Sequence, residues 1–157
     1  MKTLDQWFDE YAVSHQNKTN QLIHFVCVPA IFFSIVGMLM SIPSQFLTKT
    51  LGIENALITN WATFVLIFVL LFYLRLSFSM FLKILVFTIL CLIGNYYISQ
   101  IAPLFYTSLF IFIIAWIGQF YGHNLEGKKP SFFKDLQFLL IGPAWVIKKI
   151  TSKNQSS

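Results

Sequence analysis

The sequence has 157 residues, of which 57% are hydrophobic, 18% aromatic and only 11% charged, whereas about 25% of the residues of an ordinary soluble domain are charged. Its mean hydropathy is +0.70, and too few polar side chains are present to cover the surface of a water-soluble fold. The composition therefore excludes an ordinary soluble domain and predicts an integral membrane protein. The length predicts a single domain over residues 1–157.

An amphipathic helix is expected at the N-terminus, over residues 2–13. Leu4, Trp7, Phe8 and Tyr11 repeat at the spacing of one helical face. Such an aromatic stripe is typical of a helix that lies at the membrane interface and equally of a helix that packs on a bundle, so both interpretations stay open.

Four apolar segments have the length of membrane spans. Each is close to the roughly 20 residues that cross a lipid core of about 30 Å. They cover residues 25–42 (extended by a turn that starts at residue 21), 56–74, 80–98 and 102–121. Only short loops separate the last three, so neighbouring helices are expected to run antiparallel as hairpins.

A fifth apolar segment, residues 136–147, is too short to cross the membrane. It is interpreted as a re-entrant or interfacial segment that is broken at Gly142-Pro143. The sequence thus predicts an all-α polytopic membrane bundle of about four transmembrane helices. Its parts are an N-terminal interfacial helix and loop (1–20), four spans (21–121), a cytoplasmic-face loop with the short apolar segment (122–147) and a basic tail that frays (148–157).

Positive charge is concentrated on one side of this bundle. With four spans, both termini and the loop at Arg75 share a face that holds every lysine and arginine except Lys49. The positive-inside rule makes that face cytoplasmic, with both termini on it. Topology and anionic headgroups therefore explain the net charge of +5 better than nucleic acid does, because no basic stripe interleaved with aromatic residues occurs on a soluble element.

The same topology places all three histidines at the cytoplasmic face. His15 precedes the first span, His24 lies in its first turn and His123 in the last turn of the fourth. Neutral imidazoles suit iron, zinc, copper or nickel, and three of them at one depth resemble an open catalytic site more than a closed structural one. The alternative is that they anchor the chain at the interface.

A shared site for His15 and His24 requires a break in the helix. Over nine residues, at about 100° per residue, a continuous helix would put them on opposite faces. The stretch of residues 16–20 supplies the break, because its Asn and Thr side chains favour turns and caps. Asn20 is the candidate N-cap of the first span.

Three polar side chains are candidates to support the histidines. Gln119 and Glu126 share a helical face with His123 if the fourth span continues past it. Glu126 is interpreted first as a residue that orients a histidine, with metal ligation and pairing to a neighbouring lysine as alternatives. Asn20 and Gln119 could also orient a ligand, although a helix cap and an interhelical hydrogen bond explain them equally well.

Two segments resemble a known family. They are YAVSHQNKTNQLIHFVCVP (residues 11–29) and WIGQFYGHNLEGKKP (residues 116–130), the second followed by Gly142-Pro143. They are similar to the two motif blocks of the fungal 2-hydroxy fatty acid dioxygenase family, which acts in phytosphingosine alpha-oxidation, and of its bacterial domain-of-unknown-function relatives. The two blocks contain all three histidines, and the similarity spans nearly the whole chain.

The resemblance implies an Fe(II)-dependent dioxygenase that uses dioxygen to shorten a 2-hydroxy fatty acid by one carbon, with zinc as the alternative metal. It implies metal-binding catalytic roles for His15, His24 and His123, and Lys128 or Lys129 as the group that holds the substrate carboxylate. It also favours a bacterial inner membrane as the location. The alternative function is a non-catalytic membrane scaffold or lipid-binding protein with interfacial histidines.

Overall fold

The computed structural model describes residues 3–13, 15–127, 138 and 140–153. These residues form seven helices and contain no strand, so the all-α prediction is confirmed. The helices are α1 (Leu4–Ala12), α2 (Lys18–Met40), α3 (Gln45–Leu51), α4 (Trp61–Leu76), α5 (Phe78–Ile101), α6 (Leu104–Leu125) and α8 (Ile141–Lys153). The chain divides into two compact units, Met1–Phe32 with Ile113–Ser157, and Phe33–Phe112, so α2 and α6 each contribute residues to both. The single domain expected for the whole chain stays a prediction.

Three helices, α2, α5 and α6, are long and apolar enough to cross a membrane, and α4 is a shorter apolar helix. With 16 residues, α4 rises roughly 24 Å at 1.5 Å per residue, which is less than the lipid core of about 30 Å. The second span was predicted to begin at Ala56, but it begins at Trp61. The reason is that the Asn60 side chain accepts a hydrogen bond from the Thr63 N–H (2.9 Å) and caps the helix there.

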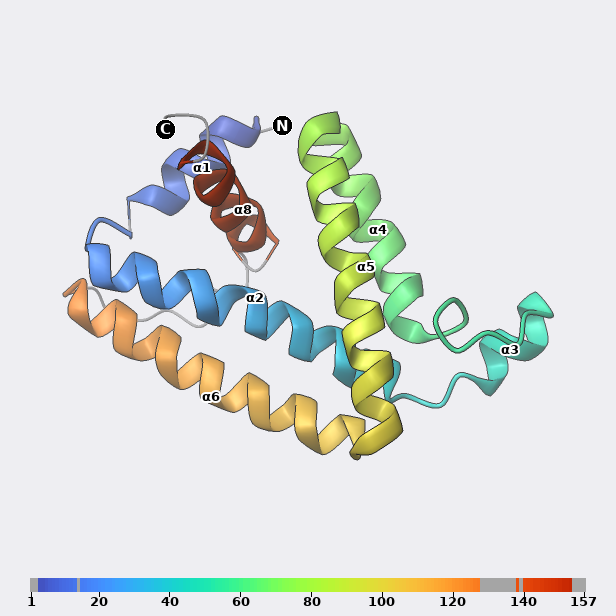
Figure 1. Cartoon of the computed structure of the whole chain (residues 1–157). Helices are drawn as coiled ribbons and strands as arrows, with labels where there is room; N and C mark the ends of the chain where they lie inside the picture. The colour runs from blue at the N-terminus through green and yellow to red at the C-terminus, as the bar shows by residue number, and fades with distance from the viewer. Residues whose placement is uncertain (1–2, 14, 128–137, 139, 154–157) are drawn as a thin grey trace. The chain divides into compact units, whose positions relative to one another are not determined.

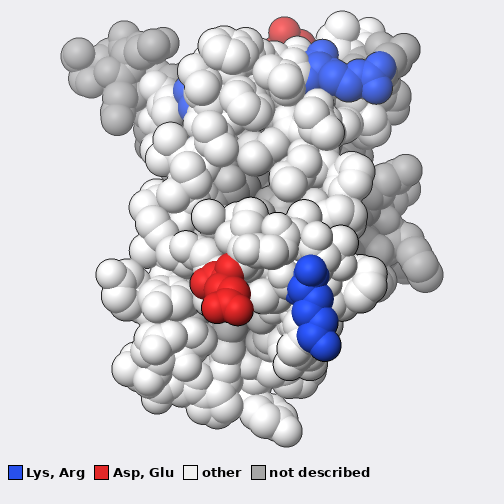
Figure 2. Space-filling model, turned by 90° about the vertical axis from the view of Figure 1, so that its right-hand side faces the viewer, with Lys and Arg blue, Asp and Glu red and all other residues white. Residues whose placement is uncertain are grey.

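Large apolar side chains are exposed along the long helices. On α6, for example, Phe110, Ile113 and Ile117 are 67%, 49% and 59% exposed. Charged side chains are sparse on the face drawn in Figure 2. Contact of so much apolar surface with water costs about 25 cal/mol per Å², so this surface is suited to lipid and agrees with a helical membrane protein.

In the unit of residues 33–112, α4 and α5 form an antiparallel hairpin (Figure 1). Ser77 alone links them: it ends α4, and its hydroxyl accepts a hydrogen bond from the Met80 N–H at the start of α5 (3.4 Å). This link is shorter than the predicted loop of residues 75–79. Ser77 is both the last cap of α4 and the first cap of α5, so no further residue is needed to connect the two helices.

Gly37 marks the point where α2, α5 and α6 approach most closely in this unit. A Cβ atom at Gly37 would overlap Ser108 Oγ of α6 and Asn95 Oδ1 of α5. Asn95 is fully buried, and its amide donates hydrogen bonds to the carbonyl oxygens of Phe33 on α2 (3.0 Å) and Cys91 (2.9 Å). A small residue and a buried amide thus hold three apolar helices together, as is common in membrane bundles.

Replacing Gly37 by alanine is expected to destabilise the protein by about 1–3 kcal/mol. The overlapped side chains are buried and cannot withdraw, and the gain in helix propensity is only about 1 kcal/mol. Thermal unfolding in detergent, followed by circular dichroism, measures the effect. Gly94→Ala is the matched control, because its Cβ would meet only the ring edge of Phe33, at 2.9 Å, which can shift. Equal melting temperatures for Gly37→Ala and wild type would contradict the expectation.

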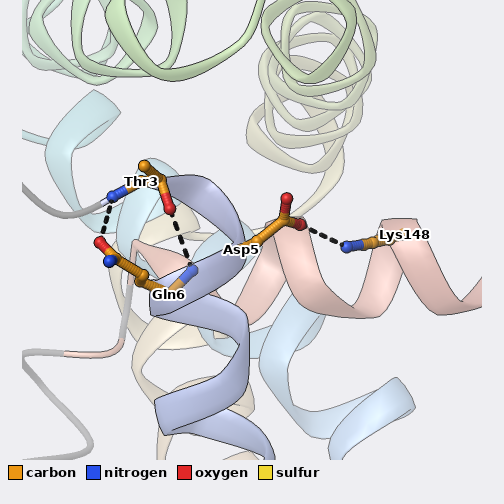
Figure 3. Close-up of polar contacts among 4 residues, drawn as sticks. All are labelled: Thr3, Asp5, Gln6 and Lys148. Atoms are coloured by element: carbon orange, nitrogen blue, oxygen red, sulfur yellow. Dashed lines mark hydrogen bonds and ion pairs between the residues drawn. The ribbon is translucent and has the colours of Figure 1, made fainter.

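In the other unit, α1 packs against α8 (Figure 1). α1 begins with a capping box between Thr3 and Gln6, and Lys148 Nζ of α8 lies 2.9 Å from Asp5 Oδ1 (Figure 3). The aromatic face of α1 points inward, since Phe8 and Tyr11 are each only 4% exposed. The predicted helix and its packing on the bundle are therefore found in this unit.

The C-terminal segment differs from its prediction. α8 begins at Ile141, so Gly142-Pro143 lies in its first turn. Proline is tolerated there because the N–H that it lacks has no partner within the helix. Residues 136, 137 and 139 lie outside the described residues, and the re-entrant or interfacial segment of residues 136–147 stays a prediction. α8 also continues to Lys153 through the residues expected to fray, and Lys149 Nζ lies 4.6 Å from the centre of the Trp145 ring.

Candidate metal centre

The connection between α1 and α2, residues 13–17, lets the first two histidines approach each other. The break predicted for residues 16–20 is found, but it lies earlier in the chain, because α1 ends at Ala12 and α2 already begins at Lys18. The Asn17 Oδ1 atom accepts hydrogen bonds from the N–H groups of Thr19 (2.8 Å) and Asn20 (3.2 Å), so Asn17 caps α2. The expectation that Asn20 is the cap is wrong, because α2 already begins at Lys18.

His15, His24 and His123 lie together in the unit formed by residues 1–32 and 113–157. One ring nitrogen of each lies within 4.8 Å of the others. The ring centres are 4.3 Å apart for His15 and His24, 5.0 Å for His24 and His123, and 5.5 Å for His15 and His123. All three side chains are buried, with exposed fractions of 3%, 1% and 5%. The structure thus brings together all three histidines singled out by the sequence, in a cluster that could bind a metal ion.

Hydrogen bonds fix the tautomer of the first two histidines. Nδ1 of His15 lies 2.6 Å from the Tyr11 carbonyl oxygen, and Nδ1 of His24 lies 2.9 Å from the Asn20 carbonyl oxygen. A carbonyl oxygen can only accept, so each Nδ1 carries the proton and each Nε2 carries the lone pair. Metal-binding histidines are commonly held in this way, with the second ring nitrogen bonded to a carbonyl or carboxylate.

Aromatic rings enclose the cluster on one side. Tyr11 stacks on His15 with ring centres 4.0 Å apart and planes 9° apart, and Trp145 of α8 lies 5.7 Å from the His15 ring. These contacts restrict rotation of the His15 ring and keep water from it. Neither Tyr11 nor Trp145 was among the residues predicted for the site. The spacing of four residues between Tyr11 and His15 was an available signal, whereas no local pattern points to Trp145.

Glu126, just beyond α6, ties that helix to the start of α2. Its carboxylate oxygens accept hydrogen bonds from the Gln16 N–H (2.7 Å), the Asn17 N–H (2.9 Å) and Asn20 Nδ2 (2.9 Å). A negative charge at a helix N-terminus is also favourable. Glu126 is not among the groups whose ligand atoms converge with those of the histidines, so its position suits an orienting role better than ligation.

The Glu126 carboxyl is ionised at neutral pH. Burial alone would raise its pKa, but hydrogen bonds from Asn17, Asn20 and Gln16, together with the electrostatic effect of His15, lower the pKa below the ordinary value of 4.5. Because its pKa is lower in the folded than in the unfolded protein, this carboxyl adds to the free energy of unfolding. The contribution is present in full above the unfolded-state pKa. That contribution is lost as the pH falls through the lower, folded-state pKa.

Replacing Glu126 by glutamine is expected to weaken metal binding about 10- to 100-fold. The amide keeps the shape but loses the charge, and its NH₂ group faces backbone N–H donors that it cannot satisfy. Competition with a chromophoric chelator measures the affinity. Glu54→Gln, a change of the same charge at an exposed position in the other unit, should leave the affinity unchanged. If Glu126→Gln also binds like wild type, Glu126 does not position the histidines.

Asn20 and Gly122 are the point of closest contact between α2 and α6 beside the histidines. A Cβ atom at Gly122 would overlap Asn20 Oδ1 and would lie 3.5 Å from His24 Cε1. Asn20 is fully buried. Its side-chain amide donates a hydrogen bond to the Glu126 carboxylate, and its backbone carbonyl oxygen accepts one from the His24 ring. Asn20 therefore links the Glu126 carboxylate to the His24 ring, which fits the orienting role predicted for it.

Gln119 lies one turn before His123 on α6 and is 4% exposed. Together with the His24 ring it lines a small cavity of about 20 Å³. Its side chain forms no hydrogen bond with another of the described residues. Neither of the two predicted roles of Gln119, an orienting hydrogen bond and an interhelical one, is therefore seen in the described part of the chain. Lys128 and Lys129, predicted to hold the substrate carboxylate, lie outside the described residues.

Apolar helices and a buried cluster of three histidines define a helical membrane protein with a candidate metal centre. Over residues 1–154 the sequence matches the family model described as 2-hydroxy-palmitic acid dioxygenase Mpo1-like. The chain belongs to this family, which confirms the family predicted from the two motif blocks. Neither a curated protein nor a solved structure matches the chain significantly.

Proposed function

We propose that this protein is an Fe(II)-dependent dioxygenase that removes one carbon from a 2-hydroxy fatty acid at the cytoplasmic face of a bacterial inner membrane. The observation that carries the proposal is the convergence of His15, His24 and His123, buried and with one ring nitrogen of each within 4.8 Å of the others. The description of the family, a 2-hydroxy-palmitic acid dioxygenase, supplies the class of substrate and reaction.

The donor set fits a catalytic iron. Three imidazoles leave coordination positions open, whereas a closed structural site usually has four protein ligands and often cysteine. His15, His24 and His123 would hold the Fe(II), which would supply the redox chemistry that a reaction with dioxygen requires. Zinc, which has no redox chemistry, would not support this reaction.

The overall reaction balances without another reductant. A 2-hydroxy acid, R–CH(OH)–COOH, and one dioxygen give R–COOH, carbon dioxide and water. The bond between the carboxyl carbon and carbon 2 breaks, and the substrate supplies all the electrons that dioxygen takes up. We therefore expect one dioxygen consumed per carbon dioxide released, with no requirement for an added electron donor.

The protein's own residues prepare the site. The carbonyl oxygens of Tyr11 and Asn20 hold the ring protons of His15 and His24 on Nδ1, so Nε2 is the nitrogen with which each ring would bind the metal. Burial of the three rings excludes bulk water and so limits side reactions. Lys128 or Lys129 is proposed to hold the substrate carboxylate.

The position of the histidines along their helices suits a lipid substrate. His24 is near the start of α2 and His123 is in the last turn of α6, so both lie near the ends of helices that are long enough to span a membrane. A fatty acid in a bilayer keeps its polar head at the interface and its tail among the lipid chains. Its reactive carbons would thus reach the histidine cluster without leaving the membrane.

Turnover by the purified protein tests the proposal. After anaerobic reconstitution with Fe(II), the protein receives dioxygen and 2-hydroxypalmitate labelled at the carboxyl carbon. We expect the acid one carbon shorter by mass spectrometry and an equal amount of labelled carbon dioxide, and neither product with zinc in place of iron. Failure to form product at nearly full iron occupancy would refute the dioxygenase and favour a non-catalytic lipid-binding protein.

A further inference from the structure

A small cavity adjoins the histidine cluster in the unit of residues 1–32 and 113–157. The His24 ring forms part of its wall, and Val28, Ile31 and Trp116 make much of the rest apolar. Its volume of about 20 Å³ compares with the roughly 10–15 Å³ needed to hold one water molecule. The cavity can therefore receive a group of one or two heavy atoms but not an acyl chain.

The Gln119 amide is the unusual feature of this wall. The side chain is 4% exposed, lines the cavity and forms no hydrogen bond with another of the described residues. A buried amide without a partner is unfavourable, and such groups in folded proteins are nearly always satisfied by a water or a ligand. We therefore expect a polar atom of a bound molecule to occupy the cavity and to form hydrogen bonds with the Gln119 amide.

The surroundings restrict the chemistry of that polar atom. No charged side chain of the described residues lines the cavity, so it is unsuited to a carboxylate. An amide offers one donor and one acceptor group, which a hydroxyl matches by accepting from Nε2 and donating to Oε1. Dioxygen has no proton to donate and would leave the Gln119 carbonyl oxygen unsatisfied.

We infer that Gln119 recognises the 2-hydroxyl group of the substrate, which enters this cavity beside His24. The inference rests on the proposed function for the identity of the substrate and adds the residue that selects it. Gln119 is one turn from His123 on the same face of α6, so a hydroxyl that it holds lies next to the cluster. An unsubstituted fatty acid has no hydroxyl to offer and would leave the amide to a water molecule, so it should bind more weakly.

Binding to the metal-free protein in nanodiscs tests the inference apart from catalysis. Displacement of a fluorescent fatty acid gives the affinities of 2-hydroxypalmitate and palmitate. We expect wild type to prefer 2-hydroxypalmitate by about 10-fold, as for one buried hydrogen bond. Gln119→Met keeps the length but removes the amide, and it should bring the preference close to one. Gln100→Met, the same substitution at an exposed position of α5, is the matched control and should retain the preference.

A second variant covers the case that Gln119→Met does not fold. Val28→Phe fills the cavity, and the preference for 2-hydroxypalmitate should then be lost although the amide is present. The inference is overturned if metal-free wild type does not discriminate between the two acids, or if either variant keeps the wild-type ratio. Because iron and dioxygen are absent, discrimination that depends on Gln119 would stand even if turnover were not observed. Conversely, turnover without this discrimination would refute only the role of Gln119.

Discussion

Purified His24→Ala protein is expected to bind iron at least about 100-fold more weakly than wild type and to form no shortened acid. The substitution removes one of the three proposed ligand nitrogens and breaks the hydrogen bond that joins the imidazole to the Asn20 backbone carbonyl oxygen. Metal content after anaerobic reconstitution and gel filtration measures the first effect, and mass spectrometry of the product measures the second.

The control for this variant lies nearby on the same helix. Leu22 is 62% exposed, so Leu22→Ala should leave the histidines in place and the iron content near that of wild type. His24→Ala protein with a full complement of iron would show that the ion binds elsewhere, and the proposed centre would then be wrong. Loss of iron from both variants would mean that general unfolding, not ligand removal, is being measured.

Gly122→Ala is expected to lower iron affinity by about 100-fold or more without altering any ligand. The new methyl group would overlap Asn20 Oδ1 and force α2 away from α6, which displaces His24 from His123. A shift of even about 0.5 Å exceeds the tolerance of metal–ligand distances, which is about 0.2 Å. Chelator competition measures the affinity, and circular dichroism checks that the helices remain.

Gly118→Ala is the matched control, since it adds the same methyl group one turn earlier on α6. There the Cβ atom would meet Cys27 Sγ at 2.6 Å, a small side chain that can rotate and that bonds to none of the histidines. We expect a much smaller loss of affinity. An equal loss in the two variants would show that any close packing change between these helices disturbs the centre.

The helices could be predicted because apolar segments of span length carry a strong signal in the sequence. The segments predicted at residues 80–98 and 102–121 correspond to α5 and α6, which are only a few residues longer. Helix starts were less predictable. Asn17 and Asn20 are both acceptable caps, and only the packed structure selects Asn17. Pro143 is likewise compatible with a break or with a first helical turn, and in the structure it lies in the first turn of α8.

The histidines could be singled out because the predicted topology put all three at one depth, and the motif blocks contained them. Their surroundings depend on contacts between segments far apart in the chain. Trp145 reaches His15 only because α8 packs against α1, and the bonds of Glu126 join residues more than 100 positions apart. The cavity beside Gln119 is a product of side-chain packing, which no periodicity in the sequence encodes.

The three histidines come from distant parts of the chain, two from near the N-terminus and one from the C-terminal third. This separation has a consequence for biosynthesis. His15 and His24 leave the ribosome before or with the first membrane segment, whereas His123 emerges only with the end of the last one. A nascent or truncated chain thus has at most two of the three imidazoles. The proposed iron ion would therefore be captured tightly only once insertion is nearly complete, which would protect half-made protein from oxidative damage.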